Sequence, residues 1–192
     1  MIEFLSMESA LKIISSIKFA ELDHNAFLKE ENTHNAWTEE AFLYKLPNKF
    51  VLSLAMLKNR ELAGYSIAYE FKDKWAHISR VAIHPLFQRQ GLGEMVLTEQ
   101  LKEFNNKKIE IATIELEKDN IRAEKLYKKL GFKALTHNEL SQYVITRERK
   151  FDDYVSKDSQ QIVMANNFTD TKIEVLFKEK EKLLNESSYT PT

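Results

Sequence analysis

A short glycine-bearing segment, Gln-Arg-Gln-Gly-Leu-Gly at 88–93, constrains this chain more than any other feature. It holds two of the four glycines and separates an apolar run at 75–83, which predicts a strand, from a run at 91–104 with helical apolar spacing. A turn at such a junction can direct several backbone N–H groups outward, where the helix dipole also favours negative charge. The segment therefore predicts an anion site, and the ligand it suggests carries phosphate.

Two common nucleotide motifs do not fit this segment. The dinucleotide motif G-x-G-x-x-G/A would need a glycine or alanine where the chain has Val96. The P-loop needs Gly-Lys-Ser/Thr, a tripeptide that the chain lacks. What remains is Gln-x-x-Gly-x-Gly, which follows Ile83-His84-Pro85.

Composition narrows the classes of protein to which the chain can belong. Its 192 residues are 43% hydrophobic and 30% charged, which is ordinary for one globular domain. A formal net charge of −1 gives no support for binding nucleic acid or a membrane surface. The absence of cysteine excludes disulfides, thiolate metal sites and a cysteine nucleophile. The five histidines show no metal-ligand spacing, so we expect no metal.

The apolar runs bear on the cellular compartment of the protein. The first residues lack the basic start and the long apolar stretch of a signal peptide, and no apolar run approaches the roughly 18 residues that span a bilayer. A cytoplasmic protein is therefore expected.

Apolar periodicity and turn residues predict a mixed α/β (α+β) fold with helices on both faces of the sheet. Helices are expected at Ser9–Leu22, from a Thr38 cap to Pro47, at Gly91–Phe104, from an Asp119/Asn120 cap to Gly131, and at Thr171–Asn185. Strands are expected at Phe50–Leu57, Glu61–Phe71, Trp75–Ile83, Ile109–Glu117 and Gln161–Ala165. One long strand or a bent pair is expected over Phe132–Ile145.

Two linked motifs resemble those of a known family. Residues 81–93 resemble motif A of the GNAT superfamily of N-acetyltransferases, and the block from Asn120 to Phe132 resembles the second half of that signature. Within the superfamily, the similarity is greatest to the ribosomal-protein N-terminal-alanine acetyltransferases. The resemblance covers residues 1–166 and implies the GNAT fold, with a mostly antiparallel sheet of six to seven strands. It leaves 167–192 as a C-terminal extension, helical at first and then disordered.

The resemblance implies that acetyl-CoA is the cofactor, with its pyrophosphate on the backbone N–H groups of 89–93. It also implies thioester contacts along 81–83 and a cofactor contact at Asn120, which reads independently as a helix cap. The implied cofactor-binding residues are Val81, Ala82, Ile83, Gln88, Arg89, Gln90, Gly91, Leu92, Gly93, Asn120 and Tyr127.

Two residues are candidates for the chemistry. Tyr127 occupies the family's general-acid position, although its spacing alone predicts a core aromatic on a helix. Glu115 matches the general-base position and continues a strand face that begins apolar, while a solvated glutamate is the alternative. His77 and Ser79 on the preceding strand are rivals for the base or its water chain.

The acceptor is expected to be a primary amine that attacks directly in a ternary complex, since no cysteine is present for an acyl relay. Composition leaves an acyl-serine open, although no serine stands beside a histidine in an activating motif. The resemblance implies a protein N-terminal α-amine. The segment Arg149–Tyr154 departs from the family's paired tyrosines, however, and its Asp152 and Asp153 would suit a small cationic amine such as a polyamine or aminoglycoside. A non-catalytic acyl-CoA-binding domain is a further alternative. We expect a monomer or homodimer.

Overall fold

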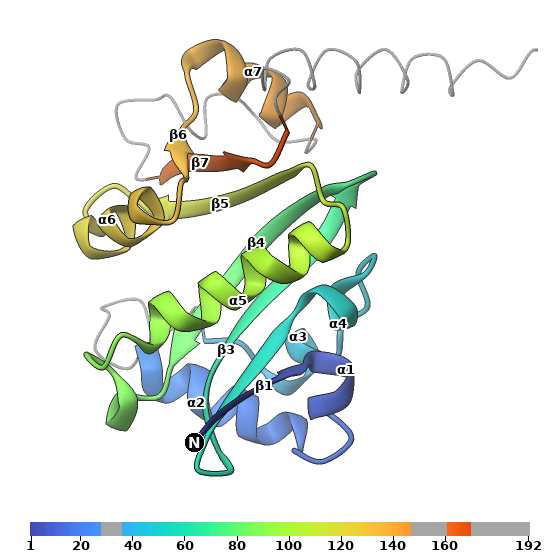
Figure 1. Ribbon diagram of the computed structural model, residues 1–192, viewed down its shortest axis with the longest axis vertical. Coiled ribbons are helices and arrows are strands. Elements are labelled where there is room, and N and C mark those ends of the chain that lie inside the picture. Colours follow the sequence, from blue (N-terminus) through green and yellow to red (C-terminus); the bar gives the residue numbers. More distant parts are fainter. Residues whose placement is uncertain (28–35, 147–160, 170–192) are drawn as a thin grey trace, which may run out of the picture. The chain divides into compact units, whose positions relative to one another are not determined.

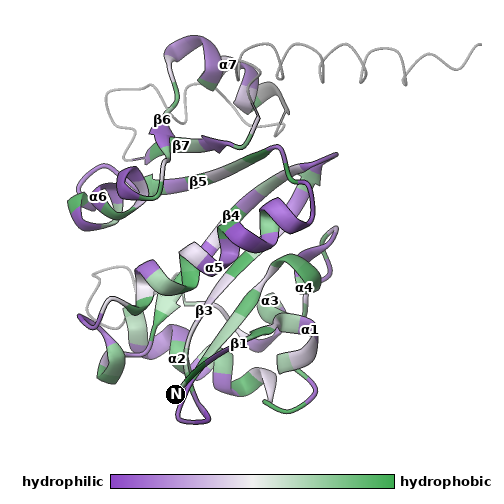
Figure 2. Ribbon diagram, in the orientation of Figure 1, coloured by the Kyte–Doolittle hydropathy of each residue, from purple (hydrophilic) through white to green (hydrophobic). Residues whose placement is uncertain are grey.

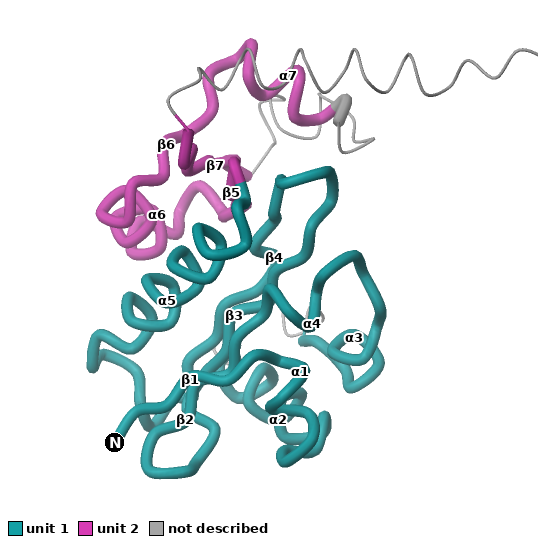
Figure 3. Tube along the Cα trace, turned by 45° about the vertical axis from the view of Figure 1, so that its right-hand side comes forward, with its two compact units in different colours: residues 1–109 teal, residues 110–192 magenta. Residues whose placement is uncertain are grey.

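The computed structural model describes residues 1–27, 36–146 and 161–169, which fall into two compact units, 1–109 and 110–192 (Figures 1 and 3). Each unit is built on an antiparallel sheet. The described residues form seven strands accompanied by helices, which agrees with the predicted mixed α/β class.

The first unit carries a four-stranded sheet in the order β1-β2-β3-β4. Its elements are β1 Ile2–Ser6, α1 Met7–Ala10, α2 Ser16–Phe27, α3 Glu39–Leu43, α4 Lys49–Leu52, β2 Leu54–Lys58, β3 Glu61–Lys72, β4 Trp75–Ile83, the 3-10 turn η2 Pro85–Phe87 and α5 Leu92–Asn106.

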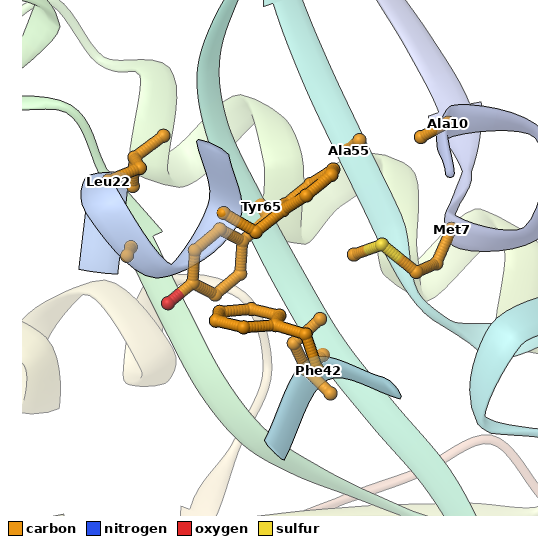
Figure 4. Packing of buried hydrophobic residues seen from close by; sticks show 9 residues of the cluster. Met7, Ala10, Leu22, Phe42, Ala55 and Tyr65 are labelled. Atoms are coloured by element: carbon orange, nitrogen blue, oxygen red, sulfur yellow. The ribbon is translucent and has the colours of Figure 1, made fainter. Parts of the chain in front are cut away.

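Alternation along the strands divides the core of this unit into two layers. Tyr65 and Ala82 contribute to a cluster with Phe19 and Phe42 of the short N-terminal helices (Figure 4). Their neighbours in the strands, such as Val81, pack on the other side of the sheet with the apolar face of α5. The green stripes on α5 and on the strands in Figure 2 mark these buried surfaces. The sheet is therefore covered on both faces, as predicted.

One glycine is required by the close approach of two strands. A Cβ on Gly64 of β3 would lie 2.6 Å from Cδ1 of Ile83 and 2.8 Å from the carbonyl oxygen of Ala82, both on β4. Any larger residue would push β4 away from β3. Further along, the register shifts between Ile67 and Ala68, so that a β-bulge bends β4 before Val81.

The second unit is a three-stranded antiparallel sheet in the order β5-β7-β6 with two helices. Its elements are β5 Ile111–Glu117, α6 Ile121–Lys129, β6 Lys133–Ala134, α7 His137–Thr146 and β7 Gln161–Asn167. Helix α6 is followed by Gly131, whose φ of 91° is left-handed, and the Asn166 side chain of β7 donates to the Leu130 carbonyl at 2.8 Å.

Three sequence-based expectations in the first unit are wrong in detail. The helix predicted at Ser9–Leu22 is two helices, α1 and α2, and α1 is capped by the Ser6 hydroxyl. The strand predicted at Phe50–Leu57 begins only at Leu54, because Lys49–Leu52 forms a helical turn, α4. Strand β1 was not predicted at all.

The strand predicted over Phe132–Ile145 is also wrong, because most of this segment is helix α7. The cause is a capping box at its start: the Thr136 hydroxyl accepts from the Glu139 N–H at 3.3 Å, and the Glu139 carboxylate accepts from the Thr136 N–H at 2.7 Å. The helix predicted at Thr171–Asn185 lies outside the described residues, and the C-terminal extension stays a prediction.

Candidate active site

The predicted anion site is a turn with two left-handed residues that leads into α5. Arg89 has φ 61° and Gly91, the N-cap of α5, has φ 76°. Gly91 makes no side-chain cap hydrogen bond, so the first N–H groups of a 15-residue helix have no side-chain cap. Left-handed residues in such a turn direct successive N–H groups into one concavity, which suits an anion.

Two glutamines brace this turn. The Gln88 side-chain amide donates to the Ile83 carbonyl at 3.0 Å, and that of Gln90 donates to the Leu86 carbonyl at 3.2 Å. The side chain of Gln88 therefore holds the end of β4 to the turn, and its expected contact with the cofactor stays a prediction.

Strand β4 presents the residues expected at the thioester. Val81 and Ile83 face the α5 side of the sheet, while Ala82 faces the layer of the N-terminal helices. Leu92 is buried beneath the turn, and Gly93 continues the first turn of α5. The expected contacts of these residues with the cofactor stay predictions.

In the second unit, Asn120 and Tyr127 both belong to α6. The Asn120 side-chain oxygen accepts from the Ala123 N–H at 3.0 Å, which confirms its predicted role as helix cap. Tyr127 is buried at 9% exposure, and its ring lies 6.0 Å from that of Phe132. Burial raises the pKa of the Tyr127 phenol to about 12, so the hydroxyl stays protonated at every physiological pH.

Glu115 is held by a partner that the sequence did not reveal. The hydroxyl of Tyr143, on α7, donates to Oε1 of Glu115, on β5, at 2.7 Å. Tyr143 is fully buried, whereas Glu115 is half-buried, so the bond fixes the orientation of a carboxylate that water still reaches. Glu115 is thus not the freely solvated glutamate of the alternative interpretation. In the sequence, the helical spacing of Leu140, Tyr143 and Val144 was the signal that could have placed Tyr143 on the inner face of a helix.

The rival residues on β4 have structural contacts. His77 is 5% exposed and packs edge-on against the rings of Tyr69 and Phe71, at 5.8 and 6.5 Å. The Ser79 hydroxyl donates to the Ile67 carbonyl at 3.3 Å. The choice of base among Glu115, His77 and a water chain at Ser79 stays a prediction.

The sequence also did not reveal a buried ion pair beside this part of β4. Arg80 donates through Nε and Nη2 to the carboxylate of Asp23, on α2, at 2.8 and 2.9 Å. Asp23 accepts further hydrogen bonds from the Tyr65 hydroxyl and the Trp37 N–H. Burial and the Asp23 charge raise the pKa of the Tyr65 phenol. The network ties α2 and residue 37 to the strand that leads into the anion site.

No group of three or more metal-ligating side chains occurs in residues 1–27, 36–146 and 161–169. In the same residues no helix is both long and apolar enough to cross a membrane. The acceptor-side segment Arg149–Tyr154, with Asp152 and Asp153, lies outside the described part of the chain.

The model of the acetyltransferase (GNAT) family matches residues 17–132, more than half of the chain. The chain belongs to this family. The match contains both the anion site and the Asn120–Tyr127 helix, as the sequence resemblance implied.

Relatives of this acetyltransferase carry the same activity in their names. It is 25% identical over 126 residues to the ribosomal protein bS18-alanine N-acetyltransferase of Escherichia coli strain K12, covering 66% of the chain and 84% of the relative. A putative enzyme of the same name from Bacillus subtilis strain 168 is 27% identical over 119 residues, covering 62% and 78%.

Solved structures show the same fold. The ribosomal-protein-S18-alanine N-acetyltransferase of Escherichia coli superposes with a TM-score of 0.66 at 21% identity, over 89% of this chain and 96% of that one. An N-acetyltransferase from Thermoplasma acidophilum, solved with coenzyme A, gives 0.61 at 18% identity, over 88% and 99%. The GNAT fold predicted from the sequence is confirmed.

Family membership makes the chain an acetyl-CoA-dependent N-acetyltransferase, which favours catalysis over the non-catalytic alternative. The anion turn fits the phosphates of this cofactor on its own geometry. A Cβ on Gly91 would meet nothing within 4 Å, so the space beside this residue is open. Backbone donors at a helix start, with Arg89 in the same turn, are the groups that bind phosphate.

Proposed function

We propose that this acetyltransferase modifies the N-terminal α-amine of a protein, by direct attack of the amine in a ternary complex. The observation that carries the acceptor is the activity in the names of three relatives, which are ribosomal protein bS18-alanine N-acetyltransferases, one of them putative. The absence of cysteine supports direct attack, because no thiol is present to carry the acetyl group.

The acceptor's own chemistry agrees with this proposal. An α-amine has a pKa of about 8, whereas a lysine amine has a pKa of about 10.4. At pH 7 the neutral, nucleophilic fraction of an α-amine is therefore roughly two hundred times that of a lysine amine.

The residues of the second unit are assigned separate proton roles. Glu115, oriented by Tyr143, accepts the proton that the amine loses as its nitrogen forms the new bond to the acetyl carbon. When bound, acetyl-CoA supplies the activated acetyl group, and its sulfur leaves as the C–S bond breaks. Tyr127 donates a hydrogen bond toward that sulfur. Backbone N–H groups of 81–83 are the proposed donors to the carbonyl oxygen.

The pKa of Tyr127 limits how far its proton travels. Complete transfer from a phenol of pKa about 12 to a thiolate of conjugate pKa about 8.5 is uphill by ~5 kcal/mol. Tyr127 is therefore assigned as a hydrogen-bond donor that stabilises the departing sulfur, and the thiol takes its final proton from water.

The test is thiol release from acetyl-CoA with a panel of acceptors, analysed by mass spectrometry. The panel contains a peptide with a free N-terminal alanine, the same peptide with a blocked N-terminus and an internal lysine, a polyamine and an aminoglycoside. We expect acetylation of the free α-amine only. A preference for the polyamine or aminoglycoside would assign the small-amine alternative instead.

A further inference from the structure

Outside the family motif, one lysine is brought to the anion turn by the tertiary structure. Lys58 ends strand β2, immediately before the left-handed pair Asn59 and Arg60 that connects β2 to β3. Its ammonium Nζ donates to the side-chain oxygen of Gln90 at 2.5 Å. The same nitrogen lies 5.3 Å from the centre of the Phe87 ring. Both partners belong to the segment that leads into α5.

The ammonium group is positioned but not neutralised. The amide nitrogen of Gln90 donates to the Leu86 carbonyl, which leaves the amide oxygen to face Lys58. An ammonium has three N–H donors, and Gln90 uses one of them. Within the described part of the chain, no carboxylate lies within ion-pair distance of Lys58. Within the described residues, no ion pair therefore neutralises the charge of Lys58 beside the turn.

The local charge balance favours an anionic ligand here. Lys58, Arg60 and Arg89 are the cations near the turn, and the nearby carboxylates are Glu61, which pairs with Lys58 in the register of β2 and β3, and Glu94, in the first turn of α5. The cofactor carries a pyrophosphate and a 3′-phosphate. A lysine acts on phosphate as a point charge, which needs no strict geometry and suits a side chain held at one end by Gln90.

We propose that Lys58 is a phosphate-binding residue of the acetyl-CoA site, held in place by Gln90 and Phe87. The inference rests on the acetyl-CoA site and is independent of the acceptor. The pyrophosphate and the 3′-phosphate share the chemistry that Lys58 recognises, and the two are separated by the choice of ligand below.

The experiment measures binding of CoA and of 3′-dephospho-CoA to the full chain by calorimetry. Three variants are compared with the wild type: Lys58→Met removes the charge, Lys58→Gln removes the charge but keeps a donor for Gln90, and Lys58→Arg keeps the charge. Lys102→Met is the matched control, because Lys102 is an exposed lysine of α5 that is paired with Glu99.

We expect Lys58→Met and Lys58→Gln to weaken CoA binding roughly three- to tenfold, while Lys58→Arg and Lys102→Met stay within about twofold of the wild type. The dependence of affinity on salt should also become shallower in the two neutral variants, because one ionic contact is lost. If 3′-dephospho-CoA binds the wild type and Lys58→Met equally, Lys58 serves the 3′-phosphate; if its binding falls in parallel with that of CoA, Lys58 serves the pyrophosphate.

Two results would overturn the proposal. Wild-type affinity in Lys58→Gln would show that the lysine only braces Gln90, and an equal loss in Lys102→Met would show a general effect of net charge. Because calorimetry needs no acceptor, failure here is separable from failure of the proposed α-amine activity.

Discussion

The Tyr143 hydroxyl donates a 2.7 Å hydrogen bond to Oε1 of Glu115, joining a fully buried phenol on α7 to a half-buried carboxylate on β5. A carboxylate that is free to rotate would sample several positions, whereas this one has a fixed oxygen. Tyr143 thereby becomes a positioning residue for the proposed base.

Replacing Tyr143 with phenylalanine tests that role. Hydrogen bonds to charged groups contribute about 1.5–3 kcal/mol, so we expect Tyr143→Phe to lower the free energy of unfolding by up to that amount and kcat roughly tenfold. The KM for acetyl-CoA should stay unchanged, because the carboxylate lies outside the anion turn. Tyr44→Phe, at an exposed tyrosine, is the control. Unchanged kcat in Tyr143→Phe would remove Tyr143 from the mechanism.

The phenol of Tyr127 gives a prediction about pH. Because burial holds its pKa near 12, the hydroxyl stays protonated from pH 7 to pH 10. Tyr127→Phe should therefore lower kcat about a hundredfold, by a factor that does not change across this range. Steady-state rates at several pH values measure the factor. A wild-type rate that declines near pH 9 with a step absent from Tyr127→Phe would contradict the raised pKa, and normal turnover would remove the assigned role.

A larger side chain should affect different properties at two glycines, CoA binding at Gly91 and stability at Gly64. Gly91→Val adds atoms in the open space before the turn at φ 76°, so we expect CoA binding to weaken more than tenfold with a stability cost of about 1–2 kcal/mol. Gly64→Ala meets Ile83 and Ala82 at less than 3 Å, so it should lower stability more than binding. Calorimetry and urea unfolding of both variants separate the two effects. Full CoA affinity in Gly91→Val would place the phosphates elsewhere.

The buried ion pair of Asp23 and Arg80 is expected to be essential for stability. Asp23→Asn leaves the Arg80 guanidinium without its counter-charge, at a cost of about 3–5 kcal/mol for a buried pair broken on one side. Urea unfolding measures the change. Loss of less than 1 kcal/mol would show that solvent compensates Arg80.

The buried ammonium of Lys49 predicts an unusual dependence of stability on pH. It donates to the carbonyl oxygens of Ala41, Phe42 and Tyr44 at the end of α3, and burial lowers its pKa from 10.5 to about 8. Between pH 8 and 10.5 the unfolded chain therefore binds more protons at this group than the folded chain does. The stability of the wild type relative to Lys49→Met should rise across that window. Unfolding curves at pH 7.5 and 9.5 test the sign, and a fall would contradict it.

Patterns in the sequence predicted the strands and helix caps that depend on residues close together in the chain. Strand β4 has the predicted bounds, Trp75–Ile83, and Asn120 caps α6 as expected, because apolar runs, caps and glycines act over a few residues. Helix α7 was within reach of the same rules, since its capping box Thr136–Glu139 is visible in the sequence.

The missed features depend on contacts between residues that are distant in sequence. Asp23 and Arg80 are 57 positions apart, Glu115 and Tyr143 are 28 apart, and Lys58 and Gln90 are 32 apart. Nothing in the residues around either partner indicates the other. The Phe50-Val51-Leu52 run resembles a strand, but burial of Lys49 at the α3 carbonyls favours a helical turn there.

The most direct measurement is acetyl transfer by the wild type to a peptide with a free N-terminal alanine, compared with the same peptide acetylated at its N-terminus and carrying a lysine. We expect one acetyl group on the α-amine, none on the lysine, and a rate that falls about a hundredfold in Glu115→Gln. Faster acetylation of the lysine or of a polyamine, or full activity in Glu115→Gln, would contradict it.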